Sequence, residues 1–381
     1  MNSHNTYIAK TFAGLEPLLI QELTDLGAQN IQLLTRAVMF EGDLALLYRA
    51  NLCLRTALRI VQPLLVSENI RTADELYDFA RSINWLRCFE TERTFSVHSV
   101  AERSDEFNNT MMVSLKVKDA IADQFRQYKG ERPSVDKDNP DVRIDVHLHR
   151  NRCTISLDTS GEALYKRGYR QGGHPAPANE TLAAALVKFS GWTPDKVLLD
   201  PFCGSGTILT EAALIASRTP PNLNRRRFGF QMLRNYDPVL LADIKKELAA
   251  QIINSDDLDL MIIGNDIAPA SIRESRANAA AAEMDEHLRL SIADFFEREP
   301  PRTPGILITN LPYGERLSSG EDIASLYKRI GDRLKNTYKG WTAYLLSGNP
   351  EAFKRIGLKS SQKYHLYNGA IACTFAKFEL Y

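Results

Sequence analysis

The stretch at 197–207, VLLDPFCGSGT, constrains the fold of this chain more than any other segment. It begins with a short apolar run that ends in an acid, and a glycine-rich turn and a helical pattern follow at once. A short apolar run bounded by turn residues is typical of a buried parallel strand. Gly204 and Gly206 let the backbone turn sharply and approach a ligand closely, because neither carries a Cβ. The order of strand, loop and helix therefore predicts a ligand crevice.

The loop differs from the fingerprint of dinucleotide-binding sites, because Leu209 stands where a third glycine would allow close helix packing. The carboxylate before the glycines repels a pyrophosphate and attracts a cation. S-adenosylmethionine (SAM) carries a positive sulfonium and a positive ammonium group, so it suits this loop better than NAD does. A buried structural turn is the alternative. The residues predicted to bind SAM here are Asp200, Phe202, Gly204, Gly206 and Thr207.

Three further apolar segments, at 260–264, 288–292 and 305–309, alternate with helical patterns after the loop. This rhythm predicts a doubly wound α/β sheet. The dipeptide Asn368-Gly369 between the last two strand-like segments is a strong hairpin signal. We therefore expect the sheet to end with an antiparallel strand.

A polar residue follows each of these three segments, at the edge where ligands bind in an open α/β sheet. Asp266 is expected to accept hydrogen bonds from both ribose hydroxyls of an adenosine, and capping the next helix is its alternative role. Asp294 and Phe295 are expected to bond to and cover the adenine ring, and Ile267 is expected beside them.

The catalytic candidates are Asn310, Leu311, Pro312 and Tyr313, at the end of the last segment. The exocyclic amino group of a base is conjugated and weakly nucleophilic, so acceptors for its hydrogens help to free its lone pair. The side-chain oxygen of Asn310 and the backbone carbonyl of Leu311 can accept them, while Tyr313 stacks on the base. Proximity and alignment then do most of the catalysis, because the proton leaves after the nitrogen becomes cationic. Asn310 also borders the predicted SAM site, and a structural turn is the alternative for this tetrapeptide.

Before the glycine loop the chain alternates short strand-like pieces with amphipathic helices, including a long helix near 110–128. Basic and aromatic residues interleave in the linker that follows, which suits a nucleic acid, with a solvated hinge as the alternative. A run of three arginines lies in a segment that interrupts the α/β rhythm; it predicts either a substrate contact or a solvated loop. The predicted units are 1–65, 66–160, a linker at 161–178, and 179–381 with an insertion at 219–257.

The composition of the chain limits which partners, metal sites and compartments we expect. The formal net charge is zero, so any surface that binds nucleic acid must be local. The five cysteines include no C-x-x-C pair, which favours a reducing compartment and argues against a zinc site. No apolar stretch approaches the length of a membrane span. We therefore expect a cytoplasmic protein with no metal and no membrane partner.

The motifs at 200–207 and 310–317, together with Arg167-Gly168-Tyr169-Arg170, resemble the signature stretches of THUMP-domain RNA methyltransferases. The similarity is greatest to the bacterial group that methylates guanine N2 in large-subunit ribosomal RNA. It implies a ferredoxin-like segment and a THUMP domain up to about residue 157, followed by a Rossmann-like class I methyltransferase domain. It further implies that Pro177, Asn179, Glu180 and Thr181 border the cofactor. The residues expected to contact RNA are Lys116, Lys118, Arg143, Arg167, Arg170, Arg225, Arg226 and Arg227.

The chain departs from the family pattern at Leu311, where the family usually carries a proline. Asn-Leu-Pro-Tyr is also the form in ribosomal RNA adenine-N6 dimethyltransferases, which leaves the target base open. The sequence therefore predicts a SAM-dependent RNA guanine-N2 methyltransferase that acts on structured 23S rRNA. The alternatives are an rRNA adenine-N6, a tRNA guanine-N2 or a DNA amino-methyltransferase, and an RNA-binding assembly factor without activity.

Overall fold

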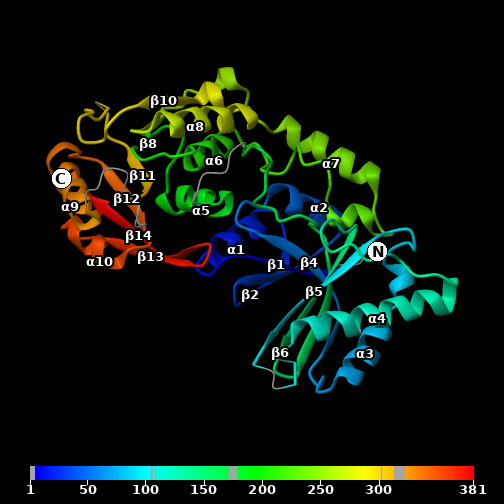
Figure 1. Ribbon diagram of the computed structural model, residues 1–381. Helices are drawn as coiled ribbons and strands as arrows, with labels where there is room; N and C mark the ends of the chain where they lie inside the picture. Colours follow the sequence, from blue (N-terminus) through cyan, green and yellow to red (C-terminus); the bar gives the residue numbers. More distant parts are fainter. Residues whose placement is uncertain (1–4, 104–105, 108, 171–177, 302, 313–321) are drawn as a thin grey trace.

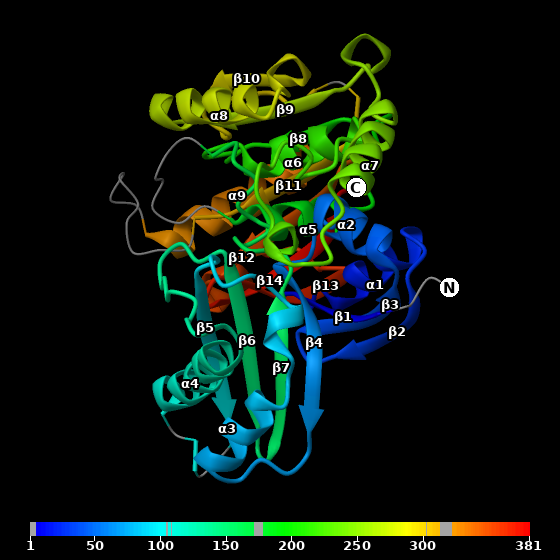
Figure 2. The same ribbon diagram turned by 90° about the vertical axis from the view of Figure 1, so that its right-hand side faces the viewer.

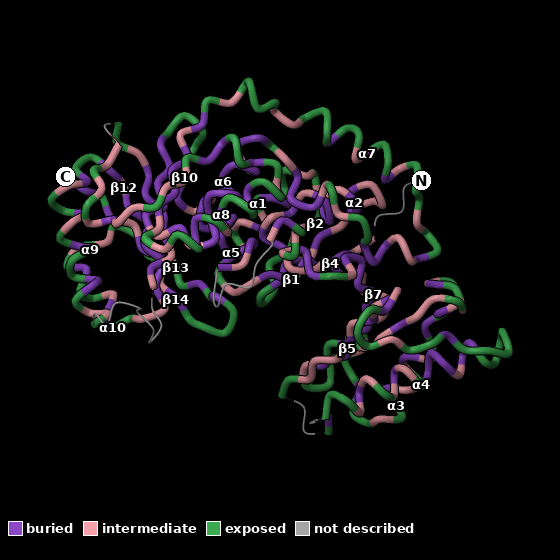
Figure 3. Tube along the Cα trace, turned by 45° about the horizontal axis from the view of Figure 1, so that its top comes forward, coloured by how far each residue is buried: buried purple, intermediate pink, exposed green. Residues whose placement is uncertain are grey.

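Two seven-stranded sheets, one in each half of the chain, form the framework of the protein (Figure 1). The computed structural model describes residues 5–103, 106–107, 109–170, 178–301, 303–312 and 322–381. No helix in these ranges is both long and apolar enough to cross a bilayer. The buried parts of the chain follow the strands and the helices against the second sheet, whereas the outer helices are exposed along one side (Figure 3).

The N-terminal sheet is continuous across the two units that the sequence separates. Its strand order is β2-β3-β1-β4-β7-β6-β5, and all its pairs are antiparallel except β5 with β6. The unpredicted strand β4 pairs with both β1 and β7, so the boundary expected between residues 65 and 66 falls inside a strand shared by both units. The elements are β1 (Asn5–Lys10), α1 (Glu16–Asp25), β2 (Gln29–Leu34), β3 (Ala37–Gly42), α2 (Leu44–Cys53), β4 (Arg59–Ser67), α3 (Ala73–Arg81), β5 (Phe95–Glu102), α4 (Thr110–Lys129), β6 (Val142–His149) and β7 (Arg152–Asp158).

The C-terminal sheet has the order β10-β9-β8-β11-β12-β14-β13, with only β14 running antiparallel to its neighbours. This confirms the expected Rossmann-like sheet with an antiparallel strand near its end. Helices α5 and α6 pack on one face, and α9 and α10 pack on the other. The elements are α5 (Glu180–Ser190), β8 (Leu198–Asp200), α6 (Thr207–Ala216), β9 (Ile262–Asp266), α8 (Pro269–Ala281), β10 (Leu288–Ile292), β11 (Ile306–Asn310), α9 (Ile323–Thr337), β12 (Thr342–Ser347), α10 (Pro350–Phe353), β13 (Gln362–Asn368) and β14 (Ile371–Glu379).

Strand order reverses between β8 and β11, because the chain runs outward from β8 to β10 on one side and from β11 to β12 on the other. In open α/β sheets the ligand crevice forms at such a switch point, beyond the carboxyl ends of the strands. Asp200 ends β8 and Asn310 ends β11. The topology therefore brings these two predicted site residues to neighbouring strand ends.

The insertion packs on the N-terminal half, although it belongs in sequence to the C-terminal domain. Its helix α7 (Pro238–Ala250) lies beside α2 (Figures 1 and 2). The rings of Tyr48 and Phe230 stack with centroids 4.4 Å apart, and the Tyr48 hydroxyl accepts a hydrogen bond from the Asp237 amide at 2.9 Å. Arg49 donates to both carboxylate oxygens of Glu247, at 2.9 and 2.6 Å. The insertion thus fastens the two halves together.

Candidate active site

The glycine loop has the geometry that its sequence demands. Gly204 and Gly206 have φ values of +52° and +76°, in the left-handed region that favours glycine. A Cβ on Gly206 would lie 2.0 Å from the hydroxyl oxygen of Ser275 on α8, whereas a Cβ on Gly204 would meet nothing within 4 Å. The amide of Cys203 donates to the carbonyl of Asn265 at 2.9 Å. The loop is therefore packed on one side and open to a ligand at Gly204.

Asp266 holds this loop in place. One carboxylate oxygen accepts the amide of Gly204 at 3.0 Å, and the other accepts the amide of Ala268 at 2.9 Å. Its alternative role as the cap of α8 is not realised, because the cap position is Ala268. Carboxylate oxygens carry further lone pairs, so Asp266 can still accept a ribose hydroxyl. The neighbouring Ile267 side chain is 69% exposed, which leaves it free for apolar contact with a ligand.

Asp200 is buried at the end of β8, with only 2% of its surface exposed. Burial raises the pKa of its carboxyl to about 7, and the nearby Asp266 adds to the rise. The hydroxyl of Thr309 and the amide of Phe202 offset part of it. A cation bound beside Asp200 would restore its charged form, so this residue suits the positive groups of SAM.

Phe295 differs from the sequence-based expectation, whereas the role of Asp294 toward adenine stays a prediction, because its carboxylate keeps acceptor capacity. The Asp294 carboxylate accepts the amide of Phe296 at 2.8 Å, which shapes the turn after β10. Phe295 is only 3% exposed, and its ring lies 5.2 Å from that of Phe202 and 5.5 Å from that of Tyr338. The ring therefore belongs to the core and is not available to cover adenine, because apolar packing holds it there.

Hydrogen bonds with β12 and α9 hold the Asn310-Leu311-Pro312 segment in place. Leu311 is fully buried, and its amide donates to the carbonyl of Leu346 at 3.0 Å. The carbonyl of Pro312 accepts the hydroxyl of Tyr327 at 3.0 Å. The side-chain oxygen of Asn310 is buried and has no hydrogen-bond partner among the residues that the structure describes. A buried acceptor gains free energy when it receives a hydrogen bond, so the Asn310 oxygen is suited to accept one from a ligand.

The N-terminus of α5 lies next to the glycine loop. Arg170 donates to the carbonyl of Ala178 at 2.8 Å and to the hydroxyl of Thr207 at 3.2 Å. Glu180 is 3% exposed, and burial raises the pKa of its carboxyl while Arg170 opposes the rise. In the described part of the chain, one Glu180 oxygen and the Thr181 hydroxyl have no hydrogen-bond partner. These unpartnered atoms, together with Asp200 and the open side of the loop, fit a polar cationic cofactor.

Two residues of the predicted site cannot be placed. Tyr313 and Pro177 lie outside the described residues. The side chain of Asn179 accepts the amide of Leu182 at 2.8 Å. Asn179 is therefore the N-cap of α5 and stabilises the start of this helix.

Comparison with known proteins agrees with this geometry. Residues 167–377 match the RMKL-like methyltransferase domain, 71–158 match the THUMP domain, and 6–61 match the RlmL ferredoxin-like domain. The chain belongs to the RMKL-like methyltransferase family. The resemblance found in the sequence is therefore confirmed, and the domain uses SAM as its methyl donor.

Several relatives match the RMKL-like chain over nearly all of its length. A Synechocystis protein named as an RNA methyltransferase is 38% identical, over 98% of this chain and 97% of its own length. The ribosomal RNA large subunit methyltransferase K/L of Shewanella amazonensis is 37% identical, over 98% of this chain and 53% of its own. The chain thus spans about half the length of the K/L relatives. The methyltransferase SMU.472, solved with SAH, superposes with a TM-score of 0.89 at 28% identity, over 100% of this chain and 99% of that one.

Three of the basic residues expected to bind RNA have structural roles in this RMKL-like protein. The Arg167 side chain is 1% exposed and donates to Glu211 at 2.6 Å. Arg170 binds the loop and α5 as described above. Arg225 is half-buried and donates to three carbonyls in the segment at 160–163. Their guanidinium groups are held by contacts inside the protein, so we remove all three from the proposed RNA surface.

The other five basic residues remain at the surface. Arg226 and Arg227 are exposed, and Arg143 is half-buried. Lys116 pairs with Asp74 at 3.1 Å, and Lys118 pairs with Asp119 at 2.7 Å. Exposed ion pairs of this kind are weak, so the two lysines are still able to exchange their partners for phosphates.

Sequence reasoning missed two residues that shape the site. Thr309 places a hydroxyl beside Asp200, and Glu211 receives both Arg167 and, at 2.9 Å, the hydroxyl of Tyr169. Each is a buried polar residue in a mostly apolar segment, on β11 and α6 respectively. That pattern was the available signal, because a buried polar group needs a partner.

Proposed function

We propose that this protein transfers the methyl group of SAM to the exocyclic N2 of a guanine in RNA, and that the RNA is 23S ribosomal RNA. The observation that carries the proposal is the buried side-chain oxygen of Asn310, unpartnered among the described residues, at the switch point opposite Asp200. SAM supplies a methyl group activated by its positive sulfur. The remaining chemistry comes from residues of this chain.

Asn310 and Leu311 orient the target amino group. One N–H of the base donates to the Asn310 oxygen and the other to the Leu311 carbonyl, which draws the nitrogen lone pair out of conjugation. The new N–CH₃ bond forms as the S–CH₃ bond breaks, and the nitrogen then loses a proton to water. The rigid hold on Leu311 and Pro312 supports this role, because alignment of the two reactants supplies much of the rate.

The RNA substrate is supported by the N-terminal half and by the relatives. A THUMP domain precedes the methyltransferase domain, and relatives at 36–38% identity are named as methyltransferases of RNA or of the large ribosomal subunit. The substrates of those relatives are the basis for proposing 23S rRNA here.

Adenine N6 is the second candidate, favoured by two observations. Leu311 replaces the family proline, and a Listeria monocytogenes protein with a TM-score of 0.88 and 28% identity is described as an N6-adenine-specific DNA methylase. Both bases present an exocyclic amino group, so the Asn310 geometry alone fits either one.

The test is methylation of ribosomal RNA from a strain that lacks the protein, using isotope-labelled SAM. Nucleoside mass spectrometry should find labelled N2-methylguanosine in 23S rRNA. Asn310→Ala should slow labelling by about 10²–10³-fold, and Asn254→Ala, at an exposed asparagine of the same domain, should retain it. Labelled N6-methyladenosine would reject guanine as the target base. Label only in DNA would reject RNA as the substrate.

A further inference from the structure

A cavity of about 380 Å³ lies at the junction of the N-terminal sheet, the linker and the insertion, away from the SAM crevice. Its walls include Arg59 of β4, Arg143 of β6, Tyr165 and Lys166 of the linker, and Arg227 of the insertion. We call it the junction pocket. We propose that the junction pocket binds one unpaired nucleotide of the RNA substrate, with a phosphate against Arg143 and Lys166. This proposal rests on the RNA substrate proposed above.

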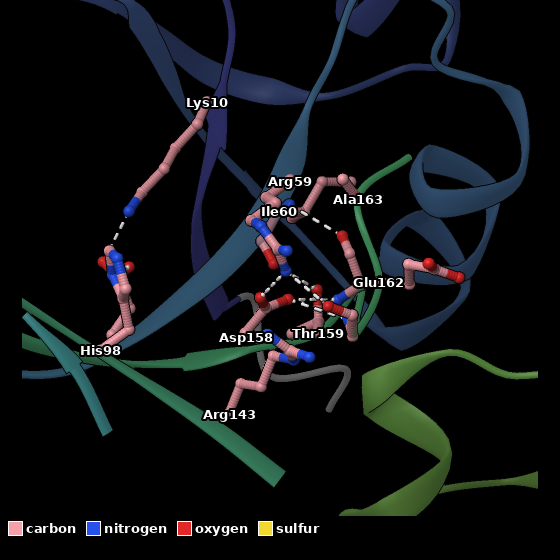
Figure 4. Close-up of polar contacts among 12 residues, drawn as sticks. Lys10, Arg59, Ile60, His98, Arg143, Asp158, Thr159, Glu162 and Ala163 are labelled. Atoms are coloured by element: carbon pink, nitrogen blue, oxygen red, sulfur yellow. Dashed lines mark hydrogen bonds and ion pairs between the residues drawn. The ribbon is translucent and has the colours of Figure 1, made fainter. Parts of the chain in front are cut away.

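Arg143 lies opposite Asp158, an acid whose oxygens already accept other hydrogen bonds. Arg143 and Asp158 face each other in the pairing of β6 with β7. One oxygen of Asp158 accepts the amides of Ser160 and Gly161, at 2.8 and 3.0 Å, and the other accepts the guanidinium of Arg59. Figure 4 shows the Arg143 side chain extending from its strand toward this group. Three of the acceptor positions of Asp158 are thus occupied, and no ion pair joins it to Arg143 in the described ranges.

The remaining contact of Arg143 is weak. Its guanidinium lies 3.5 Å from the carbonyl of Asp138, and in the described ranges it has no carboxylate within ion-pair distance. The other cations of the pocket are matched, since Arg227 pairs with Asp141 and Lys166 pairs with Glu162. Arg143 therefore presents to the pocket a guanidinium with several unused donors and no ion-pair partner in the described ranges, which suits recognition of a phosphate.

The walls of the junction pocket are rigid. A Cβ on Gly161 would lie 2.9 Å from the nitrogen of Gly229, and one on Gly229 would lie 2.5 Å from the carbonyl of Asp158, so these backbones touch. Arg225 donates to carbonyls of the linker from behind, at 2.6 and 3.2 Å for Glu162 and Ala163. A preformed site loses less conformational entropy when it binds a ligand.

Size and chemistry favour a nucleotide of a strand over a bare phosphate. The volume falls within the range of about 300–1,000 Å³ that is typical of small-ligand pockets. Tyr165 is half-buried in the wall, and a base can stack on a phenol ring. Lys166 is exposed and held only by its surface pair with Glu162, so it can turn to a phosphate. The four cations that line the pocket are balanced by Asp138, Asp141 and Glu162 of its walls and by Asp158 beside Arg59, so attraction of a phosphate depends on the unused donors of Arg143 and on Lys166 leaving Glu162.

The test compares Arg143→Ala with Arg152→Ala in the full chain. Both arginines lie on the β6–β7 hairpin, and Arg152 makes an exposed pair with Glu68 at the opposite end. We expect Arg143→Ala to weaken binding of single-stranded ribosomal RNA fragments by about tenfold and to reduce the salt dependence of the affinity by about one ion. Its KM for RNA should rise with kcat unchanged. Arg152→Ala should match the unaltered protein.

Two further variants separate a binding role from a structural one. Arg143→Lys keeps the charge and should recover part of the affinity, whereas a purely structural loss would not depend on charge in this way. Tyr165→Ala should weaken binding of unpaired RNA more than binding of a duplex. Melting temperatures and SAM affinity should stay unchanged in all four variants.

The proposal is overturned if Arg143→Ala binds RNA as well as Arg152→Ala does. It is also overturned if adenosine monophosphate or inorganic phosphate saturates the pocket while RNA binding is indifferent to Arg143, because the ligand is then a free anion. Failure of the proposed reaction is distinguishable. A labelled adenine product changes only the base assignment, whereas absence of RNA binding by the unaltered protein overturns both proposals.

Discussion

Protonation of Asp200 should make SAM binding depend on pH. In the free protein, burial raises the pKa of this carboxyl to about 7. A sulfonium or ammonium group beside it favours the ionised form, so SAM binds the ionised protein more tightly. The ionised fraction is about one tenth at pH 6 and about nine tenths at pH 8. The dissociation constant of SAM should therefore be about tenfold larger at pH 6 than at pH 8.

The stability of the free protein should change in the opposite direction to the SAM affinity: it should fall as the pH rises. Below about pH 4 the carboxyl is protonated in both the folded and the unfolded chain. Between about pH 4 and 7 the unfolded chain releases this proton while the folded chain keeps it, so the free protein loses stability as pH rises. The full loss from Asp200 alone is about 4 kcal/mol at pH 8. Bound SAM should thus raise the melting temperature more at pH 8 than at pH 6.

Isothermal titration calorimetry measures the affinity for SAM and the number of protons released when SAM binds. SAM should displace close to one proton at pH 6 and almost none at pH 8, read from buffers with different ionisation enthalpies. Asp200→Asn should bind SAM weakly at every pH and without proton release. Asp195→Asn, at a fully exposed acid on the preceding turn, should keep the full pH dependence. A SAM affinity that is constant from pH 6 to pH 8 in the unaltered protein would refute the reasoning.

Three further outcomes follow from the geometry. Asn310→Ala should lower kcat by about 10²–10³-fold and leave SAM affinity within twofold, as single-turnover kinetics and calorimetry can show. Gly206→Ala should lower the melting temperature far more than Gly191→Ala, because both have positive φ but only the first is blocked by a hydroxyl 2.0 Å away. Glu211→Gln should cost about 3–5 kcal/mol in denaturant unfolding, against less than about 1 kcal/mol for the surface-paired Glu351→Gln; equal losses would contradict a buried ion pair.

The C-terminal sheet was predictable because its signals are local. Each buried strand is a short apolar run, each ends in a polar residue, and the Asn368-Gly369 turn sets the final hairpin. The strand order also follows from the general topology of such folds. The sequence alone therefore predicts Asp200, Asp266 and Asn310 at neighbouring strand ends, where the structure has them.

The contacts between distant segments were not predictable. β4 joins two units because of pairing with strands far along the chain, and the insertion packs on α2 through Tyr48 and Phe230. Phe295 reads as a ligand-stacking residue but is held in the core. Exposure decides the role of such residues, and exposure depends on which segments meet.

Arg167 of the linker shows how contacts between distant segments change the role expected of a residue. Arg167 is basic, next to tyrosines, and reads as an RNA contact, yet it donates to Glu211 of α6 and to the carbonyl of Arg55 in the N-terminal half. α6 begins directly after the glycine loop. Separating such a buried pair costs about 3–5 kcal/mol, so the N-terminal half is held at a fixed position relative to the cofactor crevice. An RNA bound in the junction pocket would then reach the cofactor crevice from a fixed starting point, because Arg167 connects the two parts of the protein.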